Sequence, residues 1–355
     1  RSHLLESEYN SDDFMARIYE YRTWLPPGEI NFSPIGFGKQ VDIPVNEAWT
    51  KIIGPSYEDA LDSLAAKLWM IENAQHTVDL AYYIFKRDTA GYAILGALCN
   101  AVKRGVDVRI MVDSVGSFHT THNELRALET CADEAGFIRD ESGRMTDKKA
   151  RVQVVIINAL SKFSSRKNRR AHDKLIIVDG NVPERAIVMT GGRNISVAYY
   201  GIHNDGSPDP TAYKDLELIL RSHPQNSNDE PRVGDVTTGY YTLLFLNAGN
   251  KRIRPITGGG NLTKISDINN QLIYRRERER GQEKLTFVKN IPGVADSLAK
   301  MPSFFATDFN TSKVRLAHEL GNLTSSGAVT NVKENLRDNL NSITTLGLKA
   351  QSRLS

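Results

Sequence analysis

The sequence contains few cysteines and no long hydrophobic run. Its 355 residues include two cysteines, Cys99 and Cys131, which lie in segments predicted to be helical and lack the spacing of metal ligands. A disulfide framework needs a denser set, so we expect both cysteines to be reduced and structural. No apolar run approaches the roughly 18 residues that cross a bilayer. Any contact with a membrane is therefore predicted to be peripheral.

The chain also lacks a strong excess of charge of one sign, internal repeats and low-complexity tracts. It has 45 Lys and Arg residues against 42 Asp and Glu residues, a formal net charge of +3. Because this charge is small for the length, attraction to nucleic acid or anionic lipid must come from local clusters. A hydrophobic content of 40% with 25% charged residues is ordinary for a globular protein.

Composition divides the chain into three parts. Residues 1–55 are rich in Pro, Gly and aromatic residues and are predicted to form an extended arm over the body. Residues 56–250 show alternating helix and strand patterns and are predicted to form the main domain. Residues 251–355 contain a break of three glycines and a stretch of alternating charge, and are predicted to be a helical connector leading towards another domain.

Within the main domain, helical and strand patterns follow one another closely. A helix is predicted from about residue 56 and a strand over 77–85, followed by a helix over 91–104. Gly105 stands where a left-handed cap belongs, and a buried strand over 106–112 completes a βαβ unit. The fold class is therefore α/β, with a mixed, mostly parallel sheet flanked by helices. Further strands are predicted at 152–158, 174–179, 186–190 and 215–220, with helices near 123–135, 236–247 and 329–346.

One stretch combines residues that suit phosphoryl chemistry. His172 and Lys174 are two positions apart on a predicted strand, so their side chains project to the same face. Gly191 and Gly192 would let the backbone approach an anion closely, and Asn194 adds an amide donor. Each residue alone has an ordinary structural interpretation, and only the combination predicts a site for a tetrahedral phosphoryl group.

This combination resembles the signature of the phospholipase D superfamily, which is His-x-Lys, four residues, Asp, then a Gly-Gly or Gly-Ser step and Asn. Here the pattern runs from His172 to Asp179 and continues at Gly191-Gly192-Arg193-Asn194. The resemblance covers about residues 56–247, where the chain is similar to the N-terminal half of bacterial two-motif phospholipases D and cardiolipin synthases. It also includes residues upstream of the motif, namely Tyr82-Tyr83-Ile84-Phe85, Asp88, Gly91 and 104–113.

The resemblance implies covalent catalysis without a metal or other cofactor. His172 would attack phosphorus and become phosphohistidine, while Lys174 and Asn194 would hold the nonbridging oxygens. Asp215 matches the acidic residue with which the family anchors the other nitrogen of the imidazole. Asp179 stands at the strand end, where it suits a turn or a structural salt bridge, and is predicted to support the site from behind.

Two departures from the family pattern stand out. The connection between Asp179 and Gly191 is several residues longer than usual, with residues 182–185 as the apparent insertion, which the tip of a hairpin can absorb. More importantly, the sequence contains no second His-x-Lys. Because family sites join two such motifs, we expect the other half to come from the same precursor or from a homodimer partner.

A basic run immediately precedes the motif. Its members Arg166, Lys167, Arg169 and Arg170 are predicted either to form a solvated loop or to attract anions to the mouth of the site.

The leading functional hypothesis is a phospholipase D-type phosphodiesterase or phosphatidyltransferase acting on glycerophospholipid at a membrane surface. The alternatives are a metal-independent nuclease, with nucleic acid as the less favoured substrate, and a noncatalytic domain that binds phosphate or lipid. The compartment stays open, with a peripheral place in the bacterial envelope or secretion favoured over the free cytoplasm.

Overall fold

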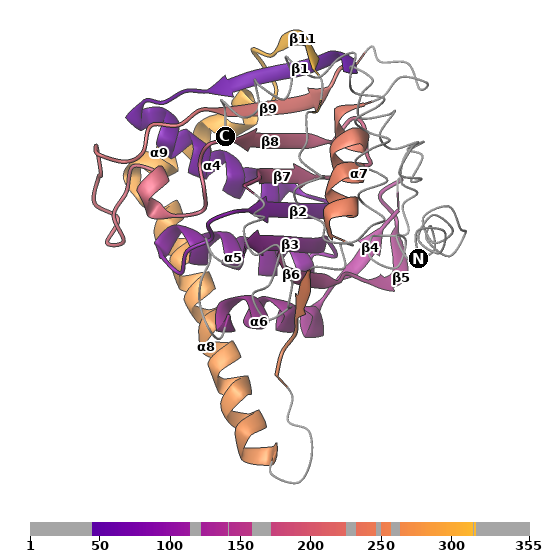
Figure 1. The fold of residues 1–355 in the computed structure, drawn as a ribbon, viewed down its shortest axis with the longest axis vertical. Coiled ribbons are helices and arrows are strands. Elements are labelled where there is room, and N and C mark those ends of the chain that lie inside the picture. Colours follow the sequence, from indigo (N-terminus) through magenta and orange to yellow (C-terminus); the bar gives the residue numbers. More distant parts are fainter. Residues whose placement is uncertain are drawn as a thin grey trace, which may run out of the picture.

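The computed structural model describes residues 45–113, 122–140, 142–157, 172–224, 232–245, 250–256, 263–314 and 316. These residues form a nine-stranded sheet in the order β10-β6-β3-β2-β7-β8-β9-β1-β11 and a small two-stranded sheet of β4 and β5 (Figure 1). The strands are β1 (Val45–Ile53), β2 (Thr77–Tyr82), β3 (Asp107–Asp113), β4 (Phe137–Arg139), β5 (Met145–Lys149), β6 (Val152–Ile157), β7 (Lys174–Val178), β8 (Ile187–Gly191), β9 (Glu217–Ser222), β10 (Lys251–Ile253) and β11 (Asn310–Val314).

The predicted α/β class, with a mixed sheet flanked by helices, is confirmed, but the expected predominance of parallel strands is wrong. Strand β3 is parallel to β2 and to β6. The other six neighbouring pairs of the large sheet are antiparallel. Between β7 and β8 the reason is the short connection over 179–186, because parallel neighbours need a crossover of a dozen residues or more.

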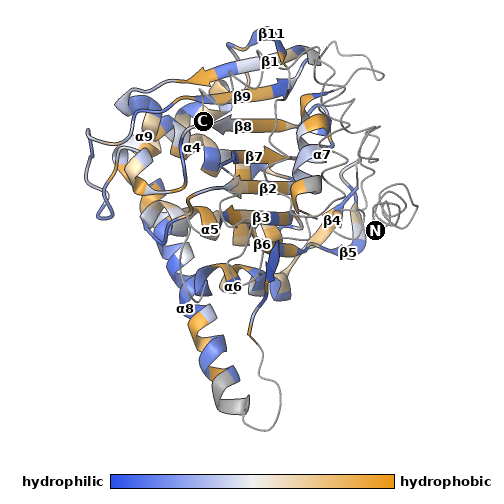
Figure 2. Cartoon of the chain, viewed as in Figure 1, coloured by the Kyte–Doolittle hydropathy of each residue, from blue (hydrophilic) through white to orange (hydrophobic). Residues whose placement is uncertain are grey.

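Helices cover both faces of the large sheet (Figure 1). Because side chains alternate along a strand, Val78 and Leu80 of β2 face one core, whereas Ala81 faces the other. Figure 2 shows the resulting concentration of apolar residues in the sheet. Helix α7 packs on one face and the other five α-helices on the opposite one. The helices are α4 (Tyr57–Asn73), α5 (Thr89–Lys103), α6 (Asn123–Thr130), α7 (Val233–Phe245), α8 (Thr263–Lys289) and α9 (Pro292–Phe304), with 3-10 turns η1 (Cys131–Glu134) and η2 (Val197–Tyr199).

Local sequence signals explain where α4 and α5 begin and end. Ser56 and Asp59 form a reciprocal capping box at the start of α4. The Asp88 carboxylate accepts the Gly91 backbone N–H at the start of α5. Gly105 has a φ of +98°, which confirms the predicted left-handed residue after that helix. These boundaries place β2 and β3 side by side as the predicted βαβ unit.

The end of the predicted arm is part of the sheet. Strand β1 lies between β9 and β11 and pairs with both, so the arm prediction is wrong for these residues. Its sequence, VNEAWTKII, mixes charged and apolar residues, and the Pro and Gly residues before it obscured the strand pattern. Residues 1–44 of the predicted arm lie outside the described residues.

The predicted C-terminal connector begins with elements that complete this body. Helix α8 packs on α5 and α6, helix α9 packs on α4, and β11 pairs with β1. The α5–α8 contact is close because a Cβ atom on Gly96 would stand 2.4 Å from the Gly281 carbonyl oxygen. Continuation towards another domain stays a prediction, and the helix predicted near 329–346 lies outside the described residues.

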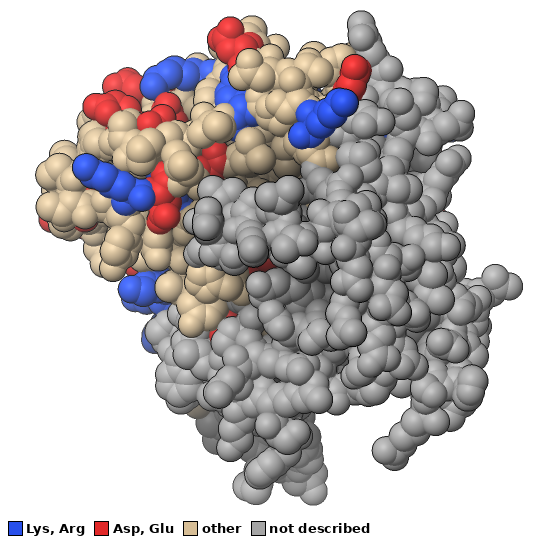
Figure 3. Space-filling view, turned by 45° about the horizontal axis from the view of Figure 1, so that its top comes forward, with Lys and Arg blue, Asp and Glu red and all other residues tan. Residues whose placement is uncertain are grey.

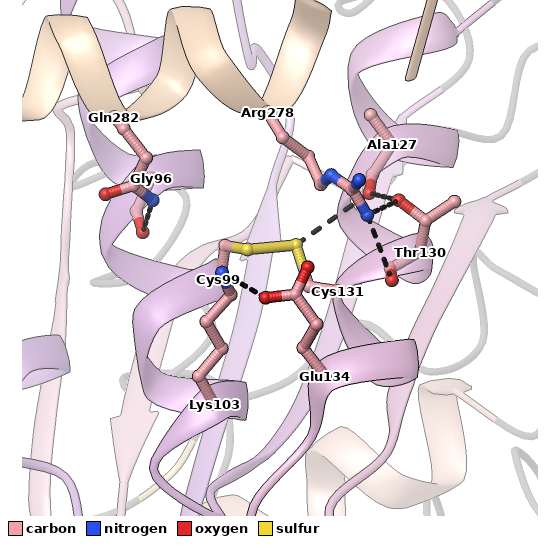
Figure 4. Close-up of a disulfide and its surroundings, with 9 residues drawn as sticks. All are labelled: Gly96, Cys99, Lys103, Ala127, Thr130, Cys131, Glu134, Arg278 and Gln282. Atoms are coloured by element: carbon pink, nitrogen blue, oxygen red, sulfur yellow. Dashed lines mark hydrogen bonds and ion pairs between the residues drawn. A yellow bond between two sulfur atoms is a disulfide. The ribbon is translucent and has the colours of Figure 1, made fainter. Parts of the chain in front are cut away.

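The two cysteines form a disulfide, contrary to the predicted reduced state. Cys99 of α5 is bonded to Cys131 of η1, with their Cα atoms 5.5 Å apart, a separation typical of disulfides (Figure 4). Arg278 of α8 donates to the Thr130 side chain beside it at 2.9 Å. The cysteines are 32 residues apart in sequence, so only the packing of α5 against the α6 region brings them together.

We expect this disulfide to stabilise the domain. Closing a loop of this length restricts the unfolded chain and is worth about 4 kcal/mol. Dithiothreitol should therefore lower the melting temperature of the wild-type protein, while a Cys99→Ala/Cys131→Ala variant should melt at the lower temperature with or without it. Two free thiols titrated in the native, non-reduced protein would show that the bond does not form.

Candidate active site

The predicted catalytic residues gather at one edge of the large sheet. Tyr82, the last residue of β2, is in register with Lys174, the first residue of β7. Gly191, the last residue of β8, is in register with Glu217, the first residue of β9. The segments that follow β2 and β8 therefore meet the segments that precede β7 and β9. His172 lies just before β7 and Lys174 begins it, Asn194 follows β8, and Asp215 precedes β9.

His172 and Lys174 are in direct contact, as their spacing predicts. The Lys174 Nζ atom lies 3.1 Å from His172 Nδ1 and donates to the His172 carbonyl oxygen at 2.9 Å. His172 is exposed and Lys174 is buried, so the imidazole lies outermost with the cation behind it. The ring of Tyr83 lies against the imidazole, with the centroids 4.8 Å apart. One solvent-facing histidine is thus held between a cation and an aromatic ring.

The burial of Lys174 changes its acid–base behaviour. Desolvation lowers the pKa of its ammonium group to about 8, although the charges of Asp173 and Asp215 oppose that shift. Lys174 is therefore mainly charged at neutral pH and loses its proton in a mildly alkaline range.

Asn194 is fixed in orientation by two hydrogen bonds. Its Oδ1 atom accepts the Ile84 backbone N–H at 3.0 Å, and its Nδ2 atom donates to the Tyr199 hydroxyl at 3.0 Å. The side chain is buried, with 2% exposure. Because an amide nitrogen carries two N–H donors, one remains for a ligand. Sequence reasoning missed Tyr199, since nothing in the motif marks a residue five positions beyond the asparagine.

The two glycines are required by close packing. A Cβ atom on Gly191 would stand 2.2 Å from the Leu216 carbonyl oxygen, and one on Gly192 would stand 2.3 Å from Asp215 Oδ1. The sequence predicted that these glycines leave room for an anion. In the structure, their small size instead allows the start of β9 and the Asp215 carboxylate to pack against them. Among the described residues no hydrogen bond joins Asp215 to His172, and the anchoring role of Asp215 stays a prediction.

Asp179 lies at the far end of β7 from His172, about 20 Å along the strand by the usual rise per residue. Its buried carboxylate accepts the backbone N–H groups of Gln75, His76 and Thr77 and pairs with Arg185 at 2.9 Å. Its φ of +50° confirms the turn. The structural salt bridge predicted for Asp179 is confirmed. Its predicted support of the site stays a prediction, because Asp179 lies at the other end of β7 from His172.

A buried ionic cluster lies behind the glycine turn and was not predicted. The Glu217 carboxylate accepts hydrogen bonds from Lys67 and Ser63 of α4, and Arg193 donates to it at 3.3 Å. Arg193 also donates to the Gly54 carbonyl oxygen at 2.6 Å. The three ionic side chains are at most 2% exposed. The signal in the sequence that could have revealed this cluster is Lys67, a lysine within the apolar face of the first predicted helix.

The predicted basic run, Arg166 to Arg170, lies outside the described residues. On the face drawn in Figure 3, the basic and acidic side chains of the described part are interspersed, without a broad area of one sign. Within the described ranges, no group of three or more His, Cys, Asp or Glu side chains is arranged to hold a metal ion. Lys174 supplies a positive charge in contact with the imidazole, which favours an anion there.

The family comparison agrees with this geometry. Residues 68–205 match the model of the cardiolipin synthase, PLD-like domain, a range that contains His172, Lys174 and Asn194. This match supports a phospholipase D-like domain over these residues. Cardiolipin synthase C of Escherichia coli is 34% identical over 172 residues, which make up 46% of this chain and 30% of that protein. The major cardiolipin synthase ClsA of Bacillus subtilis is 30% identical over 145 residues, or 41% of this chain and 26% of the relative.

The match to these phospholipase D relatives spans about a third or less of their length. Among solved structures, Nuc of Salmonella typhimurium, a phospholipase D family member, aligns with 59% of this chain and 99% of its own at 17% identity and a TM-score of 0.37. Phosphatidylserine synthase of Haemophilus influenzae aligns with 80% of this chain and 51% of its own at 11% identity and a TM-score of 0.42. Neither structural likeness bears on function.

Proposed function

We propose that this chain carries one half of a phosphatidyl-transferring or phospholipid-cleaving active site that works through a phosphohistidine at His172. The observation that carries the proposal is the Lys174 ammonium 3.1 Å from the His172 imidazole, at the same sheet edge as Asn194. A nucleophile, a cation and an oriented amide donor are the groups that phosphoryl transfer needs without a metal. The cardiolipin synthases among the relatives support a glycerophospholipid substrate.

In the proposed mechanism an imidazole nitrogen of His172 forms a bond to phosphorus as the bond to the leaving alcohol breaks. The alcohol takes its proton from an acid in the second half of the site. Lys174 and the remaining N–H of Asn194 hold the nonbridging oxygens. Attack through Nε2 requires the ring proton on Nδ1, and we assign Asp215 to accept that hydrogen bond when the phosphate draws Lys174 to its oxygens. Water or an alcohol then attacks phosphorus and gives its proton to the same group of the second half, and the phosphorus–nitrogen bond to His172 breaks.

The second half is proposed to come from the same precursor or from another copy of the chain. Within the described residues, no helix combines the length and hydrophobicity that a bilayer crossing requires. We further propose that the protein contacts the lipid surface peripherally and is located at the bacterial envelope.

The proposal is tested on vesicles of phosphatidylethanolamine and phosphatidylglycerol with EDTA present. The protein is assayed as the longer precursor or together with its second half, and the lipid products are identified by mass. We expect headgroup release that resists EDTA, giving phosphatidate if water is the acceptor and cardiolipin if phosphatidylglycerol is. Cleavage of DNA in EDTA without any lipid product would instead favour the metal-independent nuclease.

The pKa of Lys174 predicts the pH dependence of this activity. The protonated form holds the phosphate, so kcat/KM should fall as pH rises through about 8. Lys174→Arg should have lower activity but lose this alkaline decline, because a guanidinium stays charged over the whole range. An unchanged decline in the arginine variant would assign it to another group.

A further inference from the structure

A cavity of about 200 Å³ lies at the end of β7 remote from His172. It is bounded by the last turns of α4, the end of β7, the connection to β8, strand β9 and the residues just after α9. It opens at the surface, because Asn73, Glu184 and Ala306 on its rim are exposed. We call it the Arg221 cavity, after the basic residue that β9 contributes.

The inner wall of the Arg221 cavity is apolar and aromatic. Val178 and Ile187 are buried beneath it, with 2% and 5% exposure. Trp69 of α4 and Phe305 stack nearly parallel, with centroids 4.5 Å apart and an interplanar angle of 9°. The half-buried Trp69 ring, backed by the buried Phe305 ring, and the aliphatic floor suit a flat or short apolar group.

Two guanidinium groups stand at the same cavity. Arg185 is neutralised by Asp179, with Nε 2.9 Å from the carboxylate. Arg221 instead donates to the carbonyl oxygens of Phe305 and Glu184, at 2.6 and 3.1 Å, and forms no ion pair with a carboxylate of the described residues. The Glu184 carboxylate, also at the rim, pairs with neither arginine. Burial and the neighbouring charge of Arg185 lower the pKa of Arg221.

The arginine and the glutamate of the rim belong to the unusual part of the motif. Glu184 and Arg185 lie in the connection that is longer than the family pattern, residues 182–185. Arg185 lies close enough to Arg221 for their charges to interact, and the Glu184 carbonyl oxygen accepts a hydrogen bond from the Arg221 guanidinium. Glu184 and Arg185 thus form part of one wall of the cavity, at the end of β7 remote from His172.

We infer that the Arg221 cavity is a second binding site, which takes a small anion, a carboxylate or phosphate, attached to an aromatic or short aliphatic group. The anion compensates the Arg221 charge through the guanidinium donors that remain, as these groups bind planar and tetrahedral oxyanions. The apolar part lies against Trp69 and the aliphatic floor. A cavity of about 150 Å³ accommodates benzene, so this one holds a ring and its charged substituent but not a phospholipid.

Binding of 4-fluorobenzoate, followed by fluorine NMR on the full chain, tests this inference. We expect saturable binding of 4-fluorobenzoate. The affinity for 4-fluorobenzyl alcohol, which lacks the charge, should be at least ten times weaker. The affinity for inorganic phosphate, which lacks the ring and is measured by its displacement of 4-fluorobenzoate, should also be at least ten times weaker. Ala306→Phe, at an exposed position on the rim, should fill the cavity and abolish binding. Ala299→Phe on the exposed side of α9 is its matched control and should bind as the wild type does.

The charge is tested by Arg221→Gln, which should weaken binding at least tenfold, with the exposed Arg144→Gln as control. Thermal melting shows that each variant is folded. Lys174→Met should leave binding unchanged, because the candidate active site lies at the other end of β7. Absence of binding, equal binding of the alcohol, persistence of binding in Ala306→Phe, or loss of binding in Lys174→Met would each overturn the inference. None of these outcomes bears on the activity proposed for His172.

Discussion

Replacing His172 with alanine should reduce phosphodiester cleavage or exchange by at least about a thousandfold, because a covalent route is lost when its nucleophile is removed. The effect should appear in kcat, with lipid binding nearly unchanged, since the side chain is exposed and contributes little to the core. Headgroup release from the vesicles described above, in EDTA, measures it.

The matched control for this substitution is His203→Ala. His203 is another exposed histidine, in the loop before β9, and has no contact with the catalytic edge in the described structure. It should retain full activity. If His172→Ala were as active as His203→Ala in a protein that turns over lipid, His172 would not be the nucleophile.

Replacing Glu217 with methionine should destabilise the fold by about 3–5 kcal/mol, because it leaves two buried cations without their counterion. Lys67 and Arg193 both converge on this carboxylate, and burial already lowers the pKa of Lys67. Urea denaturation of the two proteins, followed by circular dichroism, gives the free energy of unfolding. Since Gly191 packs on Glu217, the glycine turn before Asn194 should also lose its position.

An exposed ion pair provides the comparison for Glu217. Glu279 pairs with Arg275 on the surface of α8, with both side chains more than half exposed. Glu279→Met should change the stability by less than about 1 kcal/mol. A similarly small change in Glu217→Met would mean that the buried cluster is not ionised or not important for the fold.

The sequence predicted the core of the fold because its strands and helices carry strong local patterns. Strand β6, VQVVII, is buried along its whole length, and α5 has both a cap residue and a terminal glycine. Strand β1 and the antiparallel majority were missed because they depend on pairing between distant segments. The same holds for the disulfide, whose two cysteines meet only through tertiary packing.

At the site, the contact between His172 and Lys174 followed from their spacing, although β7 begins only at Lys174. Residues that act through tertiary contacts were not predictable in the same way. Tyr199 reaches Asn194 only because η2 folds back on the turn, and Arg193 is buried only because Glu217 and Gly54 lie behind it. Spacing predicts which side chains share a strand face, but not which side chains from other elements meet them.

The most direct test of the central claim is the isolation of the covalent intermediate. Protein incubated with lipid is quenched rapidly at alkaline pH, which preserves phosphohistidine, digested and examined by mass spectrometry. We predict a phosphatidyl adduct on the peptide that contains His172, absent from His172→Ala. Turnover with no adduct on that peptide, or with an adduct on another residue alone, would contradict the account.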